Sequence, residues 1–186
     1  MAGHPQLDWR PNLKALIAIA SVLAVAGSGS LVPPTVLADD GPTTPAWFED
    51  HWIDLAVDWE DATACSVTPE AAECFRTEAE MDEALAADRS SVVVPLAACA
   101  SSLRLYDGAS YGGTTISLSA RLTYLNLSAY SFDNLTSSYR VGACDVDLFA
   151  NASGAGGVYP GATTANSQSP SMTSGWNNVI PSVYIY

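Results

Sequence analysis

The sequence predicts a mainly β protein, in which an antiparallel β-sandwich of two similar units follows a small acidic segment of mixed helix and strand. Three observations lead to this fold class. Short alternating segments separated by Gly, Ser and Asn fill the C-terminal part of the chain. A motif in that part recurs after about 43 residues, and acidic residues are concentrated in the part that precedes it.

The first 38 residues have the form of a secretory signal peptide. Arg10 and Lys14 precede an uncharged run that ends in small residues at Ala38. The run is also long enough for a membrane anchor, but glycines and prolines interrupt it after about a dozen strongly apolar residues. We therefore expect cleavage near Ala38, a secreted protein, and no membrane association after cleavage.

The charge of the chain excludes some partners and divides the chain. Twenty Asp and Glu against 7 Lys and Arg give a formal net charge of −13, which repels nucleic acid and anionic lipid. Residues 39–88 hold 15 acids and only Arg76, whereas residues 90–186 hold 4 acids and 3 Arg. We therefore expect an acidic N-terminal segment at 39–90 and a separate domain at 91–186.

One short helix is expected in the acidic segment. Thr77 and Glu80 have the spacing of a capping box, and Met81 and Leu85 follow at helical spacing, which predicts a helix over 78–88 with both apolar side chains inward. A further helical turn is expected at Thr68-Pro69, because proline favours the first helical position.

The remaining elements are strands and loops. Residues 39–46 contain two prolines and a glycine, so we expect a disordered leader there. Residues 161–174 are rich in Gly, Ala, Ser and Thr, so we expect a loose loop there. Alternating or β-branched segments predict strands at 52–55, 92–94, 103–106, 115–118, 124–127 and 139–141.

Four cysteines, Cys65, Cys74, Cys99 and Cys144, accompany the export signal. An even count in an oxidising compartment indicates disulfides, with three pairings possible. We favour Cys65 with Cys74, which closes a short loop, and Cys99 with Cys144, which joins the entries of the two repeat units. A zinc site is the alternative, but such sites usually contain closely spaced cysteine pairs, and this sequence has none.

The repeat is clearest in a six-residue motif that follows an aromatic residue. Phe132 precedes Asp-Asn-Leu-Thr-Ser-Ser at 133–138, and Trp176, 44 residues later, precedes Asn-Asn-Val-Ile-Pro-Ser at 177–182. Each motif has two Asp or Asn, two variable residues and a closing Ser. Both continue into an alternating segment.

A weaker upstream motif extends the repeat. In the first unit Tyr106 is followed by Tyr111 and then by a glycine, and in the second Phe149 stands 43 residues after Tyr106. The second unit has Gly154 where the second aromatic residue is expected.

On these residues the C-terminal part resembles the βγ-crystallin family, whose Greek-key unit opens with this aromatic hairpin. The resemblance implies a Greek-key β-sandwich of two units, at 102–144 and 145–186. Calcium-binding members of the family carry the six-residue motif once per unit. The chain also resembles secreted bacterial proteins described as peptidase-inhibitor-like.

Calcium is the metal that these motifs would hold, because their donors are all oxygen. The resemblance implies that the fifth-position hydroxyl of one motif completes the site of the other, so Ser137 would serve Asn177 and Asn178. Pro181 replaces the hydroxyl that would serve the first motif. We expect a weak, partly degenerate site, or turn residues that satisfy only backbone groups. The candidate ligands are Asp133, Asn134, Leu135, Ser137, Asn177, Asn178 and Val179.

Catalysis is not expected. His51 is the one histidine after Ala38, and no nucleophile motif surrounds it. Two functions follow: a secreted, non-enzymatic βγ-crystallin-like module with a weak calcium site and a structural or binding role, or a secreted proteinase inhibitor that presents an exposed loop to an extracellular protease.

Overall fold

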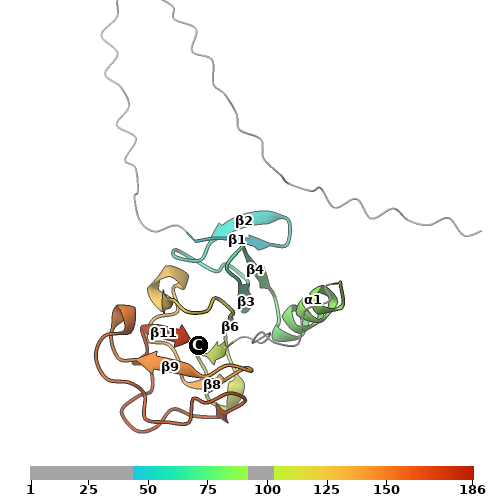
Figure 1. The fold of residues 1–186 in the computed structure, drawn as a ribbon. Coiled ribbons are helices and arrows are strands. Elements are labelled where there is room, and N and C mark those ends of the chain that lie inside the picture. The colour runs from blue at the N-terminus through green and yellow to red at the C-terminus, as the bar shows by residue number, and fades with distance from the viewer. Residues whose placement is uncertain (1–43, 92–102) are drawn as a thin grey trace, which may run out of the picture. The chain divides into compact units, whose positions relative to one another are not determined.

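Residues 44–91 and 103–186 are described by the computed structural model (Figure 1), and they form a mainly β fold with one α-helix. They all belong to one compact unit, Asp39–Tyr186. The predicted signal peptide and the predicted strand at 92–94 lie outside the described residues. No helix in the described part of the chain is both long and apolar enough to span a membrane.

Two sheets carry the repeat. The smaller has the order β7-β11-β9, and the larger begins with the order β10-β8-β5-β6, with every pairing antiparallel. β7, from the first unit, pairs with β11 of the second, and β10, from the second, pairs with β8 of the first. The units therefore exchange one strand each, as a double Greek key requires. The strands are β5 (Leu103–Tyr106), β6 (Thr115–Leu118), β7 (Tyr124–Asn126), β8 (Ser138–Arg140), β9 (Val146–Phe149), β10 (Gln168–Ser169) and β11 (Ser182–Ile185).

The strand predictions for the first unit are confirmed with small shifts. β5 and β6 match their predicted bounds, and β8 begins one residue before the predicted 139–141. β7 stops at Asn126 because a 3₁₀ helix, η2 (Leu127–Tyr130), begins there. The expected loose loop at 161–174 is wrong in part, since it contains β10 and since Met172 is buried, with its N–H donating to Ser137 O at 2.9 Å.

The acidic segment extends the larger sheet. It supplies β1 (Pro45–Phe48), β2 (His51–Asp54), β3 (Ala64–Val67) and β4 (Ala72–Phe75), and the sheet continues after β6 in the order β3-β4-β1-β2. β3 pairs in parallel with β6, with Cys65 opposite Ile116. One eight-stranded sheet thus holds strands from both predicted domains. Their division near residue 90 stays a prediction.

Two local predictions in this segment are wrong. The leader expected at 39–46 ends earlier, because Pro45 and Ala46 begin β1, where the first strand position tolerates proline. The helical turn expected at Thr68 is the turn of the β3–β4 hairpin. There Thr68 N–H donates to Ala71 O at 2.8 Å, and Thr68 Oγ1 accepts from the N–H groups of Glu70 and Ala71.

The predicted helix is confirmed as α1 (Glu78–Ser91), three residues longer than expected. One half of its capping box is formed, because Glu80 N–H donates to Thr77 Oγ1 at 3.2 Å. The Glu80 side chain accepts instead from the N–H of Arg76, the residue before the cap, at 3.0 Å. Met81 is fully buried and Leu85 half-buried, as the spacing predicts.

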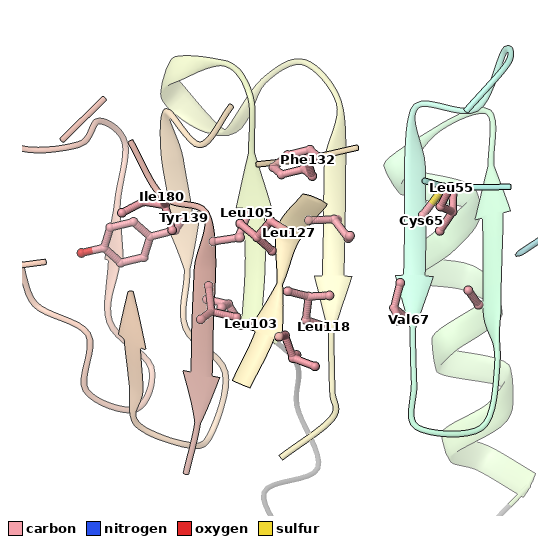
Figure 2. Close-up of a cluster of buried hydrophobic side chains, with 14 of the residues drawn as sticks. Leu55, Cys65, Val67, Leu103, Leu105, Leu118, Leu127, Phe132, Tyr139 and Ile180 are labelled. Atoms are coloured by element: carbon pink, nitrogen blue, oxygen red, sulfur yellow. The ribbon is translucent and has the colours of Figure 1, made fainter. Parts of the chain in front are cut away.

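One core joins the repeat and the acidic segment (Figure 2). Leu103, Leu105 and Leu118 of the larger sheet belong to the same buried cluster as Leu148 and Val183 of the smaller. From the acidic segment, Leu55, Cys65 and Val67 join this cluster. Trp59 stacks on Phe132 with ring centroids 5.9 Å apart, and its Nε1–H donates to Tyr130 O at 2.8 Å. The segment is therefore packed into the core as well as paired at the sheet edge.

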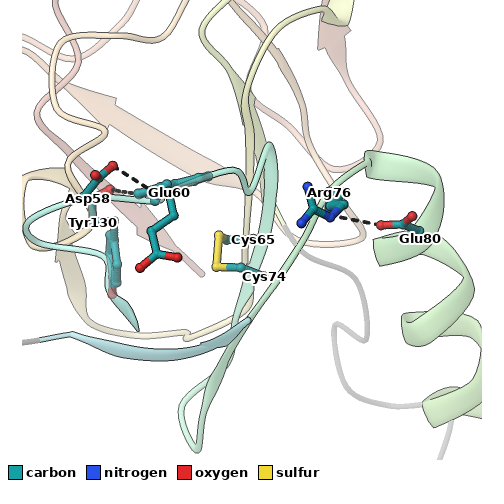
Figure 3. Close-up of a disulfide and its surroundings, with 8 residues drawn as sticks. Asp58, Glu60, Cys65, Cys74, Arg76, Glu80 and Tyr130 are labelled. Carbon is teal, nitrogen blue, oxygen red and sulfur yellow. Dashed lines mark hydrogen bonds between the residues drawn. A yellow bond between two sulfur atoms is a disulfide. The ribbon is translucent and has the colours of Figure 1, made fainter. Parts of the chain in front are cut away.

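The disulfide between Cys65 and Cys74 is confirmed (Figure 3). The two residues face each other on β3 and β4, with an S–S distance of 2.00 Å. Cys144 is buried and disulfide-bonded, and its predicted partner Cys99 lies outside the described residues. The Cys99–Cys144 pairing therefore stays a prediction.

Candidate calcium site

The two six-residue motifs lie against each other. Asn134 N–H donates to Ile180 O at 3.0 Å, and Asn178 N–H donates to Thr136 O at 3.0 Å. Because Asn134 and Asn178 are second in their motifs and Thr136 and Ile180 are fourth, the two bonds are related by the pseudo-twofold axis of the repeat. The main chain of each motif is therefore held by the other.

Both second positions require a left-handed backbone. Asn134 and Asn178 each have φ 57°, a region where asparagine is tolerated far better than branched residues. The Asn134 side chain donates from Nδ2 to Asp133 Oδ2 at 3.2 Å. These two asparagines thus serve as turn residues, whether or not an ion is bound.

The structure brings Ser137 and Asn178 together across the axis. Ser137 Oγ donates to Asn178 Oδ1 at 3.0 Å, and Ser137 is buried. At the related position of the second motif stands Pro181, which has no hydroxyl to offer Asn134. The contact between a fifth-position hydroxyl and the opposite motif therefore forms on one side of the axis.

The other predicted ligands lie in the same two loops without joining this contact. Asn177 and Leu135 are exposed, Val179 is half-buried, and Asp133 is half-buried beside Asn134. Within residues 44–91 and 103–186 no group of three or more His, Cys, Asp or Glu could hold a metal. A site here would depend on amide, hydroxyl and main-chain oxygens. These oxygens suit a hard cation, but their low charge favours weak binding.

The closing serines of the motifs have a structural role. Ser138 Oγ donates to Gly108 O at 2.6 Å and accepts from Tyr111 N–H at 3.0 Å. Ser182 Oγ repeats both bonds in the second unit, donating to Asn151 O at 2.6 Å and accepting from Gly154 N–H at 3.1 Å. Each serine ties down the aromatic hairpin of its own unit.

The aromatic residue missing at Gly154 is supplied by Tyr124. In the first unit Tyr106 and Tyr111 pack edge to face with centroids 5.7 Å apart and planes at 69°. In the second, Phe149 packs on Tyr124 at 5.7 Å and 70°, and a Cβ at Gly154 would lie 2.0 Å from the Tyr124 ring. Tyr124 belongs to the exchanged strand β7, so the sequence repeat does not reveal this replacement.

The outer face of the larger sheet contains a charged cluster that the sequence did not indicate. Arg104 Nη1 donates to Glu78 Oε1 of α1 at 2.8 Å, and its Nη2 donates to Asp82. Tyr106 Oη also donates to Glu78 Oε1, at 2.7 Å. Burial, and then this hydrogen bond, raise the pKa of Tyr106 to about 12. The cluster fastens the start of α1 to the first unit.

His51 is held by carboxylates rather than by a nucleophile. Its Nε2 lies 2.8 Å from Glu60 Oε2 and its Nδ1 3.2 Å from Asp50 Oδ1, on the exposed face of β2. The hydrogen bond to Glu60, and then that to Asp50, raise the pKa of His51. Since both ring nitrogens face carboxylates, this histidine is arranged as a surface ion pair.

Comparison with known proteins finds βγ-crystallin domains among solved structures. No family model and no curated protein matches the chain. A βγ-crystallin domain from Clostridium beijerinckii is 23% identical, with 46% of this chain and 97% of that chain covered and a TM-score of 0.38. A βγ-crystallin from Ciona intestinalis is 19% identical, with 45% and 98% covered and a TM-score of 0.39. A βγ-crystallin domain from Flavobacterium johnsoniae is 18% identical, with 45% and 92% covered and a TM-score of 0.37. The resemblance predicted from the two motifs and this comparison thus point to the same kind of domain.

Proposed function

We propose that this protein is a secreted, non-catalytic binding module whose double Greek key holds one weak calcium site. The observation that supports the site is the 3.0 Å contact between Ser137 Oγ and Asn178 Oδ1, from opposite motifs. A hydroxyl and an amide oxygen at this separation can turn their lone pairs toward one cation. Main-chain oxygens of Asn177 and Val179 would supply further ligands.

The reciprocal hydrogen bonds of Asn134 and Asn178 support a preformed site. They fix the two loops without using the side chains of Ser137 and Asn178. An ion would therefore bind without first ordering the chain. Binding is weak because the nearest donors are neutral, and calcium affinity rises with the number of charged ligands.

The site is single because Pro181 stands where the second hydroxyl would be. Proline also lacks an N–H. In the first unit, Ser137 N–H donates to Tyr106 O at 2.8 Å, a bond that Pro181 cannot make to Phe149. The second unit thus lacks both a ligand for calcium and a donor for its own aromatic hairpin.

Calorimetric titration of the secreted protein with calcium tests the site. Wild type is expected to bind one ion at millimolar concentration, and Ser137→Ala is expected to abolish that binding. Pro181→Ser is expected to strengthen calcium binding, because its hydroxyl would complete the site of the first motif. Ser171→Ala, in an exposed loop, is the matched control and should titrate like wild type. Two ions bound at micromolar concentration, or no change in Pro181→Ser, would contradict the proposed ligand arrangement.

Secretion has its own test. The protein recovered from culture medium is expected to begin near Asp39, and an N-terminus at Met1 in that material would contradict cleavage. Inhibition of an extracellular protease through an exposed loop stays an alternative prediction. Assay of the same secreted material against a panel of metallo- and serine proteases would decide it.

A further inference from the structure

A hollow lined by aromatic side chains lies on the outer face of the smaller sheet. Tyr184 of β11 is paired with Tyr124 of β7 on one side and with Asp147 of β9 on the other. The next row of the same strands is Leu125, Val183 and Leu148, which are buried in the core. Because side chains alternate across a sheet, the Tyr124–Tyr184–Asp147 row points away from the core.

The aromatic rings on this face are inclined to one another rather than coplanar. The series Phe149, Tyr124, Tyr184, Tyr186 has successive centroids 5.7, 5.0 and 5.0 Å apart, and successive planes meet at 70°, 54° and 67°. With Leu122, Thr123 and Asp147 these rings line a hollow of about 570 Å³. Tyr124 and Tyr186 are each about half exposed, at 51% and 50%. Rings inclined in this way can surround a compact group on several sides.

A carboxylate belongs to the same hollow. Asp147 Oδ2 accepts a hydrogen bond from Tyr186 Oη at 2.6 Å, which fixes that ring beside the acid. Arg121 donates from Nε to the main-chain oxygen of Tyr186 at 2.7 Å and is not among the residues that line the hollow. The hollow therefore combines π faces with a negative charge, in a chain whose net charge is −13.

In the first unit, a cation of the chain itself lies between aromatic rings at the related place. The pseudo-twofold partner of Tyr184 is Arg140, 44 residues earlier. The Arg140 guanidinium lies 4.1 Å from the centroid of Tyr111 and 5.5 Å from that of Tyr106, with Nη1 3.9 Å from Glu78. The first unit thus holds a cation of its own between two aromatic rings and a carboxylate. In the second unit the arginine is replaced by another ring.

We propose that the hollow binds a soluble quaternary ammonium compound of the choline type. Such a cation is attracted to ring faces within about 6 Å of their centroids, and angled aromatic walls with an adjacent acid are the arrangement that recognises it. The ammonium group packs against the tyrosines and Asp147, as the Arg140 guanidinium packs against two rings and Glu78 in the first unit. No residue that lines the hollow belongs to either six-residue motif, so binding there does not depend on calcium.

Nuclear magnetic resonance titration of the secreted protein in calcium-free buffer tests this site, with choline and tetramethylammonium as probes. The N-methyl signals are expected to shift upfield and to saturate at millimolar ligand. Asp147→Asn and Tyr184→Ala should each weaken binding by about tenfold. Trp52→Ala, which removes an exposed ring on β2, is the matched control and should bind like wild type. Thermal unfolding establishes that each variant is folded, and Tyr186→Ala replaces Tyr184→Ala if the latter does not fold.

The neutral carbon analogue of choline separates charge from shape. It is expected to give no saturable shift, because it lacks the charge that Asp147 and the rings attract. Equal binding of the analogue, or unchanged binding by folded Asp147→Asn and Tyr184→Ala, would overturn the proposal. Binding to phosphatidylcholine vesicles without binding to free choline would overturn the assignment to a soluble ligand.

Discussion

The two sheets of the double Greek key are built from the same repeat, but their outer faces are completed differently. On the larger sheet, α1 is attached through Glu78 and Asp82 to Arg104, and Arg140 lies over Tyr111. On the smaller sheet the related positions are Asp147 and Tyr184, and Tyr124 and Tyr186 beside them stay half exposed. The repeat thus preserves the backbone bonds of the motifs, while face residues decide whether a surface is covered internally or left accessible.

The largest expected effect concerns the aromatic hairpins. In the first unit the second ring comes from the hairpin itself, whereas in the second unit it comes from Tyr124 of β7. Gly154→Ala should lower the free energy of unfolding by about 3 kcal/mol, because φ is +75° and a Cβ would collide with Tyr124. Chemical denaturation measures it. In the Tyr124→Ala background the collision disappears, so the same substitution should cost less there. Equal costs in both backgrounds would show that Tyr124 does not occupy the missing ring's place.

The attachment of α1 to the first unit is the second test of the comparison. Glu78→Gln should lower the free energy of unfolding by about 1–2 kcal/mol, because Arg104 and Tyr106 lose a charged acceptor at a half-buried site. The pKa of Tyr106, raised to about 12 by burial and by Glu78, should fall in the variant. Absorbance titration of tyrosinate measures that fall. Asp82→Asn, which leaves Tyr106 bonded to Glu78, is the control and should leave that pKa higher than in Glu78→Gln.

A smaller effect is expected where the two motifs differ in polarity at their fourth position. Thr136 Oγ1 is buried with no hydrogen-bond partner among the described residues, and its counterpart Ile180 is fully buried and apolar. Thr136→Val should raise the free energy of unfolding by about 1 kcal/mol, since it removes an unsatisfied hydroxyl at constant shape. The urea midpoint measures the gain. A lower midpoint would mean that the hydroxyl has a partner that stabilises it.

The smallest effect is a pH dependence confined to the extension of the larger sheet. Glu60 and Asp50 raise the pKa of His51, so the stabilising charge on the imidazole is complete below its ordinary pKa of about 6.5. That contribution is lost as the pH rises through the raised, folded-state pKa. Melting temperatures of wild type and His51→Gln should therefore differ at acidic pH and converge at alkaline pH. A constant difference would exclude a role for the protonated ring.

Local patterns predicted the elements whose interactions are local. Alternation located β5 and β6, and the spacing of Thr77 and Glu80 located the start of α1, because these signals lie within a few residues. At Thr68 the local signal for a helical turn was wrong, because the paired strands on either side require a hairpin turn. Propensity alone could not show that pairing.

Long-range features of the candidate sites were less predictable. The family resemblance implied that Ser137 serves Asn178, and the two side chains are hydrogen-bonded, while their role as calcium ligands stays a prediction. The sequence repeat could not show that Tyr124 replaces the aromatic residue missing at Gly154. It also could not show that Tyr184 lies beside Asp147, because both features depend on strand register between distant segments. The parallel pairing of β3 with β6 is likewise absent from any local pattern.

The exchange of β7 and β10 has a consequence for cooperativity. Since each sheet of the repeat contains a strand from the opposite unit, neither unit can complete its hydrogen-bond ladder alone. Opening one sheet removes a strand partner from the other half, so the two halves form a single foldon. Slowly exchanging amides of β8 and β11 should therefore share one opening free energy under native conditions, whichever unit they belong to.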